Sequence, residues 1–300
     1  MSIYLKIYHA TEGNKTLARQ FISSLKKRDK TIAAWWNTDG KTIIKKMQAD
    51  ITAQLQMMPS DYWRLTNLKA INRAVSQVIA GAGSQFQKAL YDGQKATMDM
   101  AVDELEKQFK SAGLGTVSRA FMADDVMAGI NPLTQVITEH FKEDIAKRIN
   151  SEIAFSLTNG EGAFAASGRL QNAIGISTAS ADRIAVTEMN RAYSYAQQIR
   201  GEEMAAENGS LRKIWVSSHS PDAREDHLQV EQESMENPLE IDADFEVPGK
   251  NGIELAQFPH DARLSAGSSV NCKCGIVYVN VEDAEAMAKV ITENLESAQS

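Results

Sequence analysis

Apolar residues recur every three or four positions over most of the first 110 residues, and this spacing constrains the fold more than any other feature. Such spacing gathers apolar side chains on one face of an α-helix. Strand signals are nearly absent from this half, so residues 1–155 are predicted to be an arrangement of long helices. The periodic positions are Leu17, Phe21, Ile22, Leu25, Ile32, Trp35, Trp36, Ile43, Ile44, Met47, Ile51 and Leu55, then Leu65, Leu68, Ile71, Val75, Val78, Ile79, Phe86, Leu90, Met98, Val102, Leu105 and Phe109.

Turn-forming residues predict where these helices are interrupted. Breaks are expected at residues 37–40, 59–61 and 81–83, a glycine-containing connector at 111–135 in which 120–127 could form a short helix, and a further helix from about 133 to 149. Residues 156–180 are small and polar and predict an inter-domain linker. The Trp35-Trp36 and Met57-Met58 pairs are interpreted as packing or interface residues, because Trp and Met commonly fill cores and contacts.

The second half predicts a small α+β domain over residues 181–280, followed by a C-terminal helix at 281–300. A helix is expected from about Ser180 to Asn208, on which Glu188 and Arg191 are three positions apart and able to pair, although Glu188 could instead point at the strands that follow. The β-prone run at 212–218 and the alternating run at 275–279 predict strands of a short antiparallel or mixed sheet. The predicted fold class is therefore α+β, with a mostly helical N-terminal region.

Charge and composition narrow the function classes. Residues 1–150 carry 21 Lys and Arg against 15 Asp and Glu, whereas residues 151–300 carry 11 against 24. This asymmetry suggests different partners for the two halves, although long solvated helices also carry many lysines. No apolar run is long enough to cross a bilayer, and the first residues do not have the pattern of a signal peptide. Two cysteines one residue apart make a poor disulfide, so a reducing compartment is expected.

Asp, Arg, His and Cys residues of the second half allow three interpretations. His227, His260, Cys272 and Cys274 form a soft ligand set that suits zinc. Asp222, Arg224 and His227 could instead supply the base and the anion holder of a nuclease. In the third interpretation these residues brace long loops by charge-assisted hydrogen bonds, and the cysteines are buried as small apolar groups.

The order of several segments resembles the phage head morphogenesis family, whose members are minor head proteins with a phage Mu F-like domain. The matching segments cover about residues 180–280. They are Ala185-Val186-Thr187-Glu188 with Asn190 and Ala192, Lys213-Ile214-Trp215, the Asp-x-Arg-x-x-His element of Asp222, Arg224 and His227, Phe245-Glu246-Val247-Pro248-Gly249, Phe258-Pro259-His260-Asp261 and Asn271-Cys272-Lys273-Cys274. The site network that we carry forward consists of Glu188, Asp222, Arg224, His227, Asp261 and Asn271.

The resemblance implies a structural protein of a tailed-phage virion that joins the procapsid at the portal vertex, with a role in DNA packaging or ejection. Portal, capsid or scaffold proteins are the implied partners, the host cytoplasm is the site of assembly, and no membrane is involved. Packaged double-stranded DNA is a further candidate partner, and Lys26, Lys27, Arg28, Lys45 and Lys46 are the candidate contacts to DNA or protein. The alternative is a metal-dependent nuclease, or another effector enzyme, delivered with the genome. No cofactor other than zinc is expected.

Overall fold

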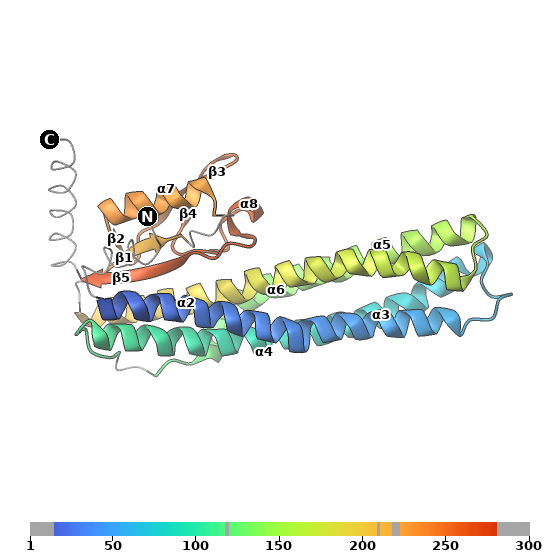
Figure 1. The fold of residues 1–300 in the computed structure, drawn as a ribbon, viewed down its shortest axis with the longest axis horizontal. Helices are drawn as coiled ribbons and strands as arrows, with labels where there is room; N and C mark the ends of the chain where they lie inside the picture. The colour runs from blue at the N-terminus through green and yellow to red at the C-terminus, as the bar shows by residue number, and fades with distance from the viewer. Residues whose placement is uncertain (1–14, 118–119, 209–210, 218–222, 281–300) are drawn as a thin grey trace. The chain divides into compact units, whose positions relative to one another are not determined.

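The computed structural model describes residues 15–117, 120–208, 211–217 and 223–280 (Figure 1). It confirms the predicted α+β class, with helices through the N-terminal region and a small antiparallel sheet toward the C-terminus. Contacts between residues divide the chain into two compact units. Unit 1 contains residues 1–31, 94–127 and 187–300, and unit 2 contains residues 32–93 and 128–186.

Long helices make up most of the described chain, and short strands follow from residue 211 onward. The helices are α2 (Lys15–Trp35), the π-helical turn η1 (Trp36–Gly40), α3 (Lys41–Gln56), the 3-10 turn η2 (Leu65–Asn67), α4 (Leu68–Ser111), α5 (Ala123–Thr158), α6 (Ala163–Asn208), α7 (Glu225–Glu236) and α8 (Ala266–Ser269). The strands are β1 (Leu211–Val216), β2 (Leu239–Glu240), β3 (Phe245–Gly249), β4 (Gly252–Ala256) and β5 (Gly275–Asn280).

Unit 2 is a bundle in which the connections at 57–67 and 159–162 join α3 to α4 and α5 to α6 as antiparallel pairs (Figure 1). Its buried side chains come from the periodic positions of the sequence, as expected for amphipathic helices. Phe86 is central among them: its ring lies 6.1 Å from the ring of Trp35 and 5.5 Å from that of Phe141. Trp35 also donates from Nε1 to the Ala89 carbonyl at 3.1 Å, so this residue of the tryptophan pair serves packing.

Unit 1 contains a three-stranded antiparallel sheet in the order β2-β1-β5, and β3 and β4 form a separate hairpin. In the register of β1 and β5, Ile214 faces Val277 and Trp215 faces Ile276. Side chains alternate between the two faces of a sheet, so each strand contributes to two different cores.

One face of the sheet packs against α2. The core on this face consists of Ala18, Phe21, Leu25, Ile214, Val216, Val277 and Val279. Gly275 permits this close approach, because a Cβ atom there would lie 3.0 Å from Leu25 Cδ2 and 3.2 Å from Phe21 Cζ. Burial of this apolar face against the sheet stabilises the position of α2.

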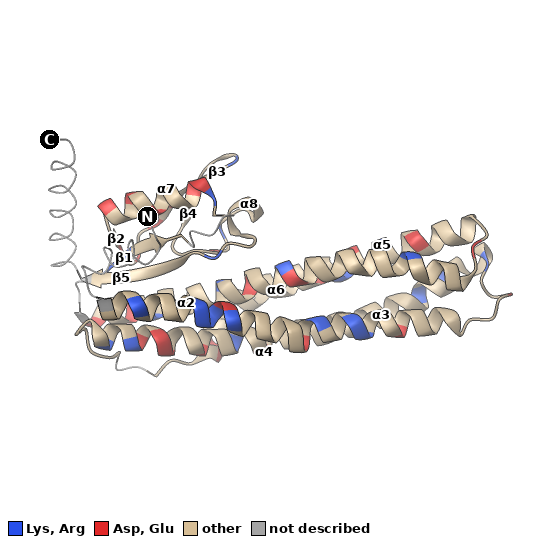
Figure 2. Cartoon of the chain, viewed as in Figure 1, with Lys and Arg blue, Asp and Glu red and all other residues tan. Residues whose placement is uncertain are grey.

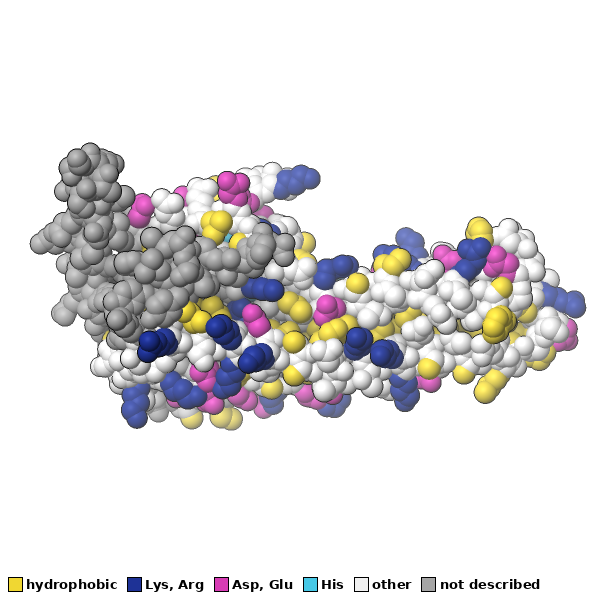
Figure 3. Space-filling view, in the orientation of Figure 1, with side chains coloured by type: hydrophobic (Ala, Val, Ile, Leu, Met, Phe, Trp, Pro, Cys, Tyr) yellow, Lys and Arg dark blue, Asp and Glu magenta, His cyan; other side chains and the backbone are white. Residues whose placement is uncertain are grey.

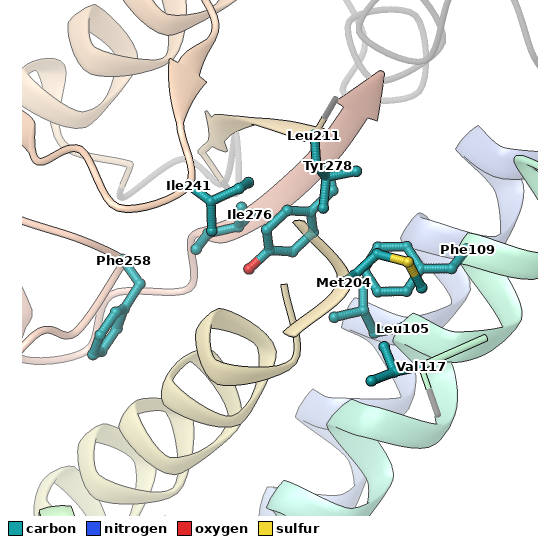
Figure 4. Close-up of a cluster of buried hydrophobic side chains, with 9 residues drawn as sticks. All are labelled: Leu105, Phe109, Val117, Met204, Leu211, Ile241, Phe258, Ile276 and Tyr278. Atoms are coloured by element: carbon teal, nitrogen blue, oxygen red, sulfur yellow. The ribbon is translucent and has the colours of Figure 1, made fainter. Parts of the chain in front are cut away.

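The opposite face packs against α4 and α6 through nine buried side chains (Figure 4). Tyr278 lies at its centre: its ring meets Phe109 edge-on at 5.9 Å, and its hydroxyl donates to the Gln197 carbonyl at 2.9 Å. Gly201 leaves room for this ring, since a Cβ atom there would lie only 2.6 Å from Tyr278 Cε1. The sheet is therefore held between helices from distant parts of the chain.

The predicted linker over 156–180 is wrong, because residues 163–180 belong to the single helix α6. Small residues alone do not break a helix, and hydroxyl groups can bond back to the preceding turn. Ser177 donates to the Ala173 carbonyl at 3.0 Å, and Thr178 donates to the Ile174 carbonyl at 2.9 Å. The hydroxyl groups of Ser177 and Thr178 thus form their hydrogen bonds within the helix.

Two further predicted interruptions are wrong, and a third differs in form. The glycines of residues 81–83 lie inside α4, and Pro132 lies inside α5, which begins at Ala123 rather than near residue 133. Residues 36–40 form a π-helical turn between α2 and α3 instead of a loop. Buried side chains on both sides of each site, such as Ile79 and Phe86, offset the unfavourable local propensity. The predicted helix at 281–300 lies outside the described residues.

Candidate functional site

His227, Cys272 and Cys274 come together in unit 1, as the sequence analysis anticipated. His227 Nδ1 lies 3.3 Å from Cys274 Sγ and 3.5 Å from Cys272 Sγ. All three residues are buried, and no disulfide joins the two cysteines. One ligand atom from each residue lies within 4.8 Å of the others, so the group has the spacing of a metal site.

Helix α7 and strand β1 position the His227 ring. His227 lies in the first turn of α7, and its ring meets the Trp215 ring of β1 edge-on at 5.3 Å. Trp215 also meets Phe245 of β3 edge-on at 5.4 Å, and its backbone N–H donates to Ser234 Oγ at 3.0 Å. The imidazole is therefore buried against the Trp215 ring, which Phe245 supports from the other strand.

His260 lies beside the cysteines and is held from two sides. Its Nε2 lies 2.8 Å from the Cys272 carbonyl oxygen, and its own carbonyl accepts from Arg191 Nε at 2.8 Å. Arg191 also pairs with Glu188 one turn earlier on α6, which confirms the predicted i, i+3 pair. Glu188 is buried, and its Oε2 has no hydrogen-bond partner among the described residues.

Arginine and histidine side chains satisfy the backbone of the segment that carries the cysteines. Arg224 donates to the Val270 carbonyl at 2.6 Å, and His260 bonds the Cys272 carbonyl. Arg28 of α2 donates to the carbonyls of Lys273 and Cys274, each at 3.0 Å. These charge-assisted bonds replace the ladder bonds that an irregular segment lacks.

The remaining predicted network residues brace the surrounding loops. Asn271 has a φ of 57°, a left-handed conformation that Asn tolerates, and its N–H donates to Thr187 Oγ1 at 3.4 Å. Asp261 accepts from the backbone N–H of Gln257 at 2.9 Å and from Arg263 Nη2 at 2.7 Å. Asp222 lies outside the described residues.

Burial and hydrogen bonds shift the pKa of several groups around the site. A hydrogen bond from Cys274, aided by His260 and His227, holds the pKa of the Cys272 thiol well below its ordinary value despite burial. Burial acts to raise the pKa of Asp261, but hydrogen bonds from Arg263 and Gln257 outweigh it and leave the pKa low. Burial lowers the pKa of Lys213 to about 8, and its Nζ donates to the Gln257 carbonyl at 2.8 Å.

The five predicted contact residues have different environments. Lys26 and Lys27 of α2 and Lys45 and Lys46 of α3 are exposed, and Lys27 pairs with Glu104 at 2.7 Å. Figure 2 colours the basic residues along these two helices blue. Arg28 is fully buried, so the expectation that it contacts DNA or a partner is wrong. Its helical phase continues the apolar face of Phe21 and Leu25, which turns it inward.

Comparison with protein-family models, curated proteins and solved structures gives no match. Within the described ranges, none of the helices is both long and apolar enough to cross a bilayer. The chemical groups of the site therefore indicate what it can do. It combines two thiols, two imidazoles and a buried Glu–Arg pair, a set that can brace loops or hold a soft metal ion.

Sequence reasoning missed two contributors to the site, Arg28 and Trp215. Arg28 bonds a residue 246 positions later in the chain, a contact that no local pattern reveals. The available signal was its position seven residues after Phe21, on the buried stripe of the helix. For Trp215, the alternation of β1 gives the face on which it lies but not its contact with the His227 ring.

Proposed function

We propose that this chain is a minor head protein of a tailed phage, which acts in procapsid assembly at the portal vertex. One observation carries the proposal: the separate segments on which the family resemblance rests contact one another in a single network. Thr187 reaches Asn271, Arg191 reaches His260, and His227 reaches the cysteines. A chance resemblance between scattered short motifs gives no reason for such convergence.

Burial of His227 and of the residues around it favours an assembly role over the enzyme alternative. Of the other two nuclease candidates, Arg224 is half-buried and Asp222 lies outside the described residues. Glu188, His227, His260, Cys272 and Cys274 are each at most 3% exposed. A nuclease must bring its base and anion-binding groups to a phosphate backbone. The described charged groups of this network bond backbone groups or other charged side chains, which supports a role in holding the fold.

Exposed apolar side chains near the connections of unit 2 support a protein partner. Met57 and Phe164 are each 82% exposed, Leu65 is 54% exposed and Phe155 is 50% exposed. Trp63 Nε1 donates to the Glu161 carbonyl at 2.7 Å, so the connections after α3 and α5 lie at the same end of this unit. Figure 3 shows hydrophobic side chains at the surface of this part of the bundle. Exposed apolar groups of this kind mark protein contacts, here to a portal or scaffold protein.

Co-assembly with particles tests the proposal. The full chain is expressed with the portal, scaffold and capsid proteins of the same phage genome, and particles are separated on a density gradient. The chain is expected to sediment with procapsids that contain portal and to be lost from particles assembled without portal. The variant M57S/F164S is expected to fold and to lose this sedimentation.

A matched variant and a nuclease assay complete the test. K45S/K46S removes two exposed charges from α3 of the same unit and is expected to leave sedimentation with particles unchanged. If its DNA binding falls and becomes less dependent on salt, these lysines contact DNA. Wild-type protein that stays out of portal-containing particles would overturn the assembly role. Metal-dependent DNA cleavage that His227→Ala abolishes would establish the enzyme alternative.

A further inference from the structure

We infer that His227, Cys272 and Cys274 bind one Zn²⁺ ion, with His260 as the fourth ligand. This inference goes beyond the proposed function and does not depend on it. The first argument is distance. Ligands about 2.3 Å (sulfur) and about 2.0 Å (nitrogen) from zinc, at a tetrahedral angle, stand about 3.5 Å apart. His227 Nδ1 lies 3.3 Å and 3.5 Å from the two sulfur atoms.

The second argument is hydrogen-bond accounting at His227. The Nδ1 atom of a histidine offers either one proton or one lone pair, yet both cysteine sulfurs converge on it. The sulfur of Cys272 also accepts from the backbone N–H of Cys274 at 3.4 Å, so nitrogen and sulfur atoms meet at one point. A metal ion at this point would be coordinated by the nitrogen and by both sulfurs, and binding would release the thiol protons to solvent.

The third argument concerns the tautomer of His260. A carbonyl oxygen only accepts, so the 2.8 Å contact with Cys272 O requires a proton on Nε2. In the neutral ring, Nδ1 then carries the lone pair, and this buried atom has no hydrogen-bond partner among the described residues. A backbone carbonyl that fixes the far nitrogen of a histidine is the usual second support of a metal ligand.

The fourth argument is the surrounding chain. The ligands come from α7, from the residue before Asp261 and from the irregular segment that enters β5, so one ion would join a helix to two loops beside the sheet. Two sulfurs with imidazole nitrogens form a set suited to Zn²⁺ rather than to Mg²⁺ or Ca²⁺. The burial of all four side chains matches a closed structural site rather than an open catalytic one.

Zinc content and cobalt spectra of the full chain test this inference. Protein purified with reductant and without chelator is loaded with zinc, dialysed and measured by elemental analysis. One zinc per chain is expected. Co²⁺ in place of zinc should give a thiolate charge-transfer band and the visible bands of a tetrahedral ion. Bound zinc should also protect both thiols from alkylation.

Variants distinguish the ligands from their surroundings. C272S, C274S and H227N are expected to weaken zinc affinity at least 100-fold, and H260N by about 10- to 100-fold. H140N is the matched control, because His140 is an exposed histidine of α5, and it should bind like the wild type. Chelator treatment of the wild type is a test that does not depend on whether a variant folds. Removal of zinc by the chelator should lower the melting temperature and expose the thiols. Less than one tenth of an equivalent of zinc in the reduced wild type, or full binding by C272S/C274S, would refute the site.

Discussion

Replacing Arg28 with methionine tests whether this side chain holds the cysteine segment in place. The guanidinium is buried, donates to two backbone carbonyls at 3.0 Å and lies 5.4 Å from the centre of the Tyr193 ring. Each bond from a charged donor contributes about 1.5–3 kcal/mol, and the cation–π contact adds about 1 kcal/mol. Relief of the buried charge offsets part of this sum, so R28M should lose about 4 kcal/mol of stability in unit 1.

Native-state hydrogen exchange of β5 measures this loss, because β5 follows the segment directly and pairs with β1. R28K keeps the charge but cannot reach both carbonyls in a fork geometry, so it should lose about 2 kcal/mol. K26M is the matched control on the exposed side of α2 and should stay within about 0.5 kcal/mol of the wild type. If the amides of β5 exchange as slowly in R28M as in K26M, the claim that Arg28 holds the cysteine segment in place is refuted.

Three further predictions concern other buried contacts. Lys213 has a pKa of about 8 when folded against 10.5 as its ordinary value, so unfolding takes up a proton at alkaline pH. Stability of the wild type relative to K213M should therefore rise by about 2 kcal/mol from pH 7 to pH 10, and a flat difference in denaturant titrations would contradict this. G201A should cost about 1–3 kcal/mol because its Cβ meets Tyr278, whereas G175A in the same helix meets nothing within 4 Å and should gain up to about 1 kcal/mol in thermal unfolding. Y278F should lose about 1 kcal/mol, since it removes the buried bond that the hydroxyl donates to the Gln197 carbonyl, and equal urea midpoints would argue against that bond.

Periodicity predicted the helices well because amphipathic faces pack in the same way wherever they occur. The predicted breaks were wrong where glycine, proline or small polar residues lie inside a helix, as in α4, α5 and α6. Their local cost is about 1 kcal/mol for glycine and about 3 kcal/mol for proline, and buried neighbours on both sides offset it. Pro132 shows this, since Met127 and Ile130 before it and Phe141 after it are all buried.

The sequence predicted which residue types gather at the site, but it did not predict which residues hold them in place. Cysteine and histidine are rare in this chain, so their grouping near residues 227–274 already favoured a common location. Arginine is common, and its role depends on which face of a helix it occupies. Arg28 and Lys26 are two positions apart, but the first is buried and the second exposed. Only the packing of α2 on the sheet separates a structural arginine from a surface lysine.

The hydrogen bonds to the backbone at residues 270–274 help to distinguish two roles of the site, which are bracing this segment and binding a ligand. The carbonyls of residues 270, 272, 273 and 274 are bonded by Arg224, His260 and Arg28. An irregular buried segment needs such donors, so bracing alone explains why the arginines are present. It does not explain the sulfurs, because a segment that needed only small apolar side chains at 272 and 274 could use alanine or valine. Two sulfur atoms that converge on one histidine nitrogen are a feature that bracing does not require. The cysteines are therefore the residues on which the proposed zinc site depends, and the arginines are the residues that bond the backbone of their segment.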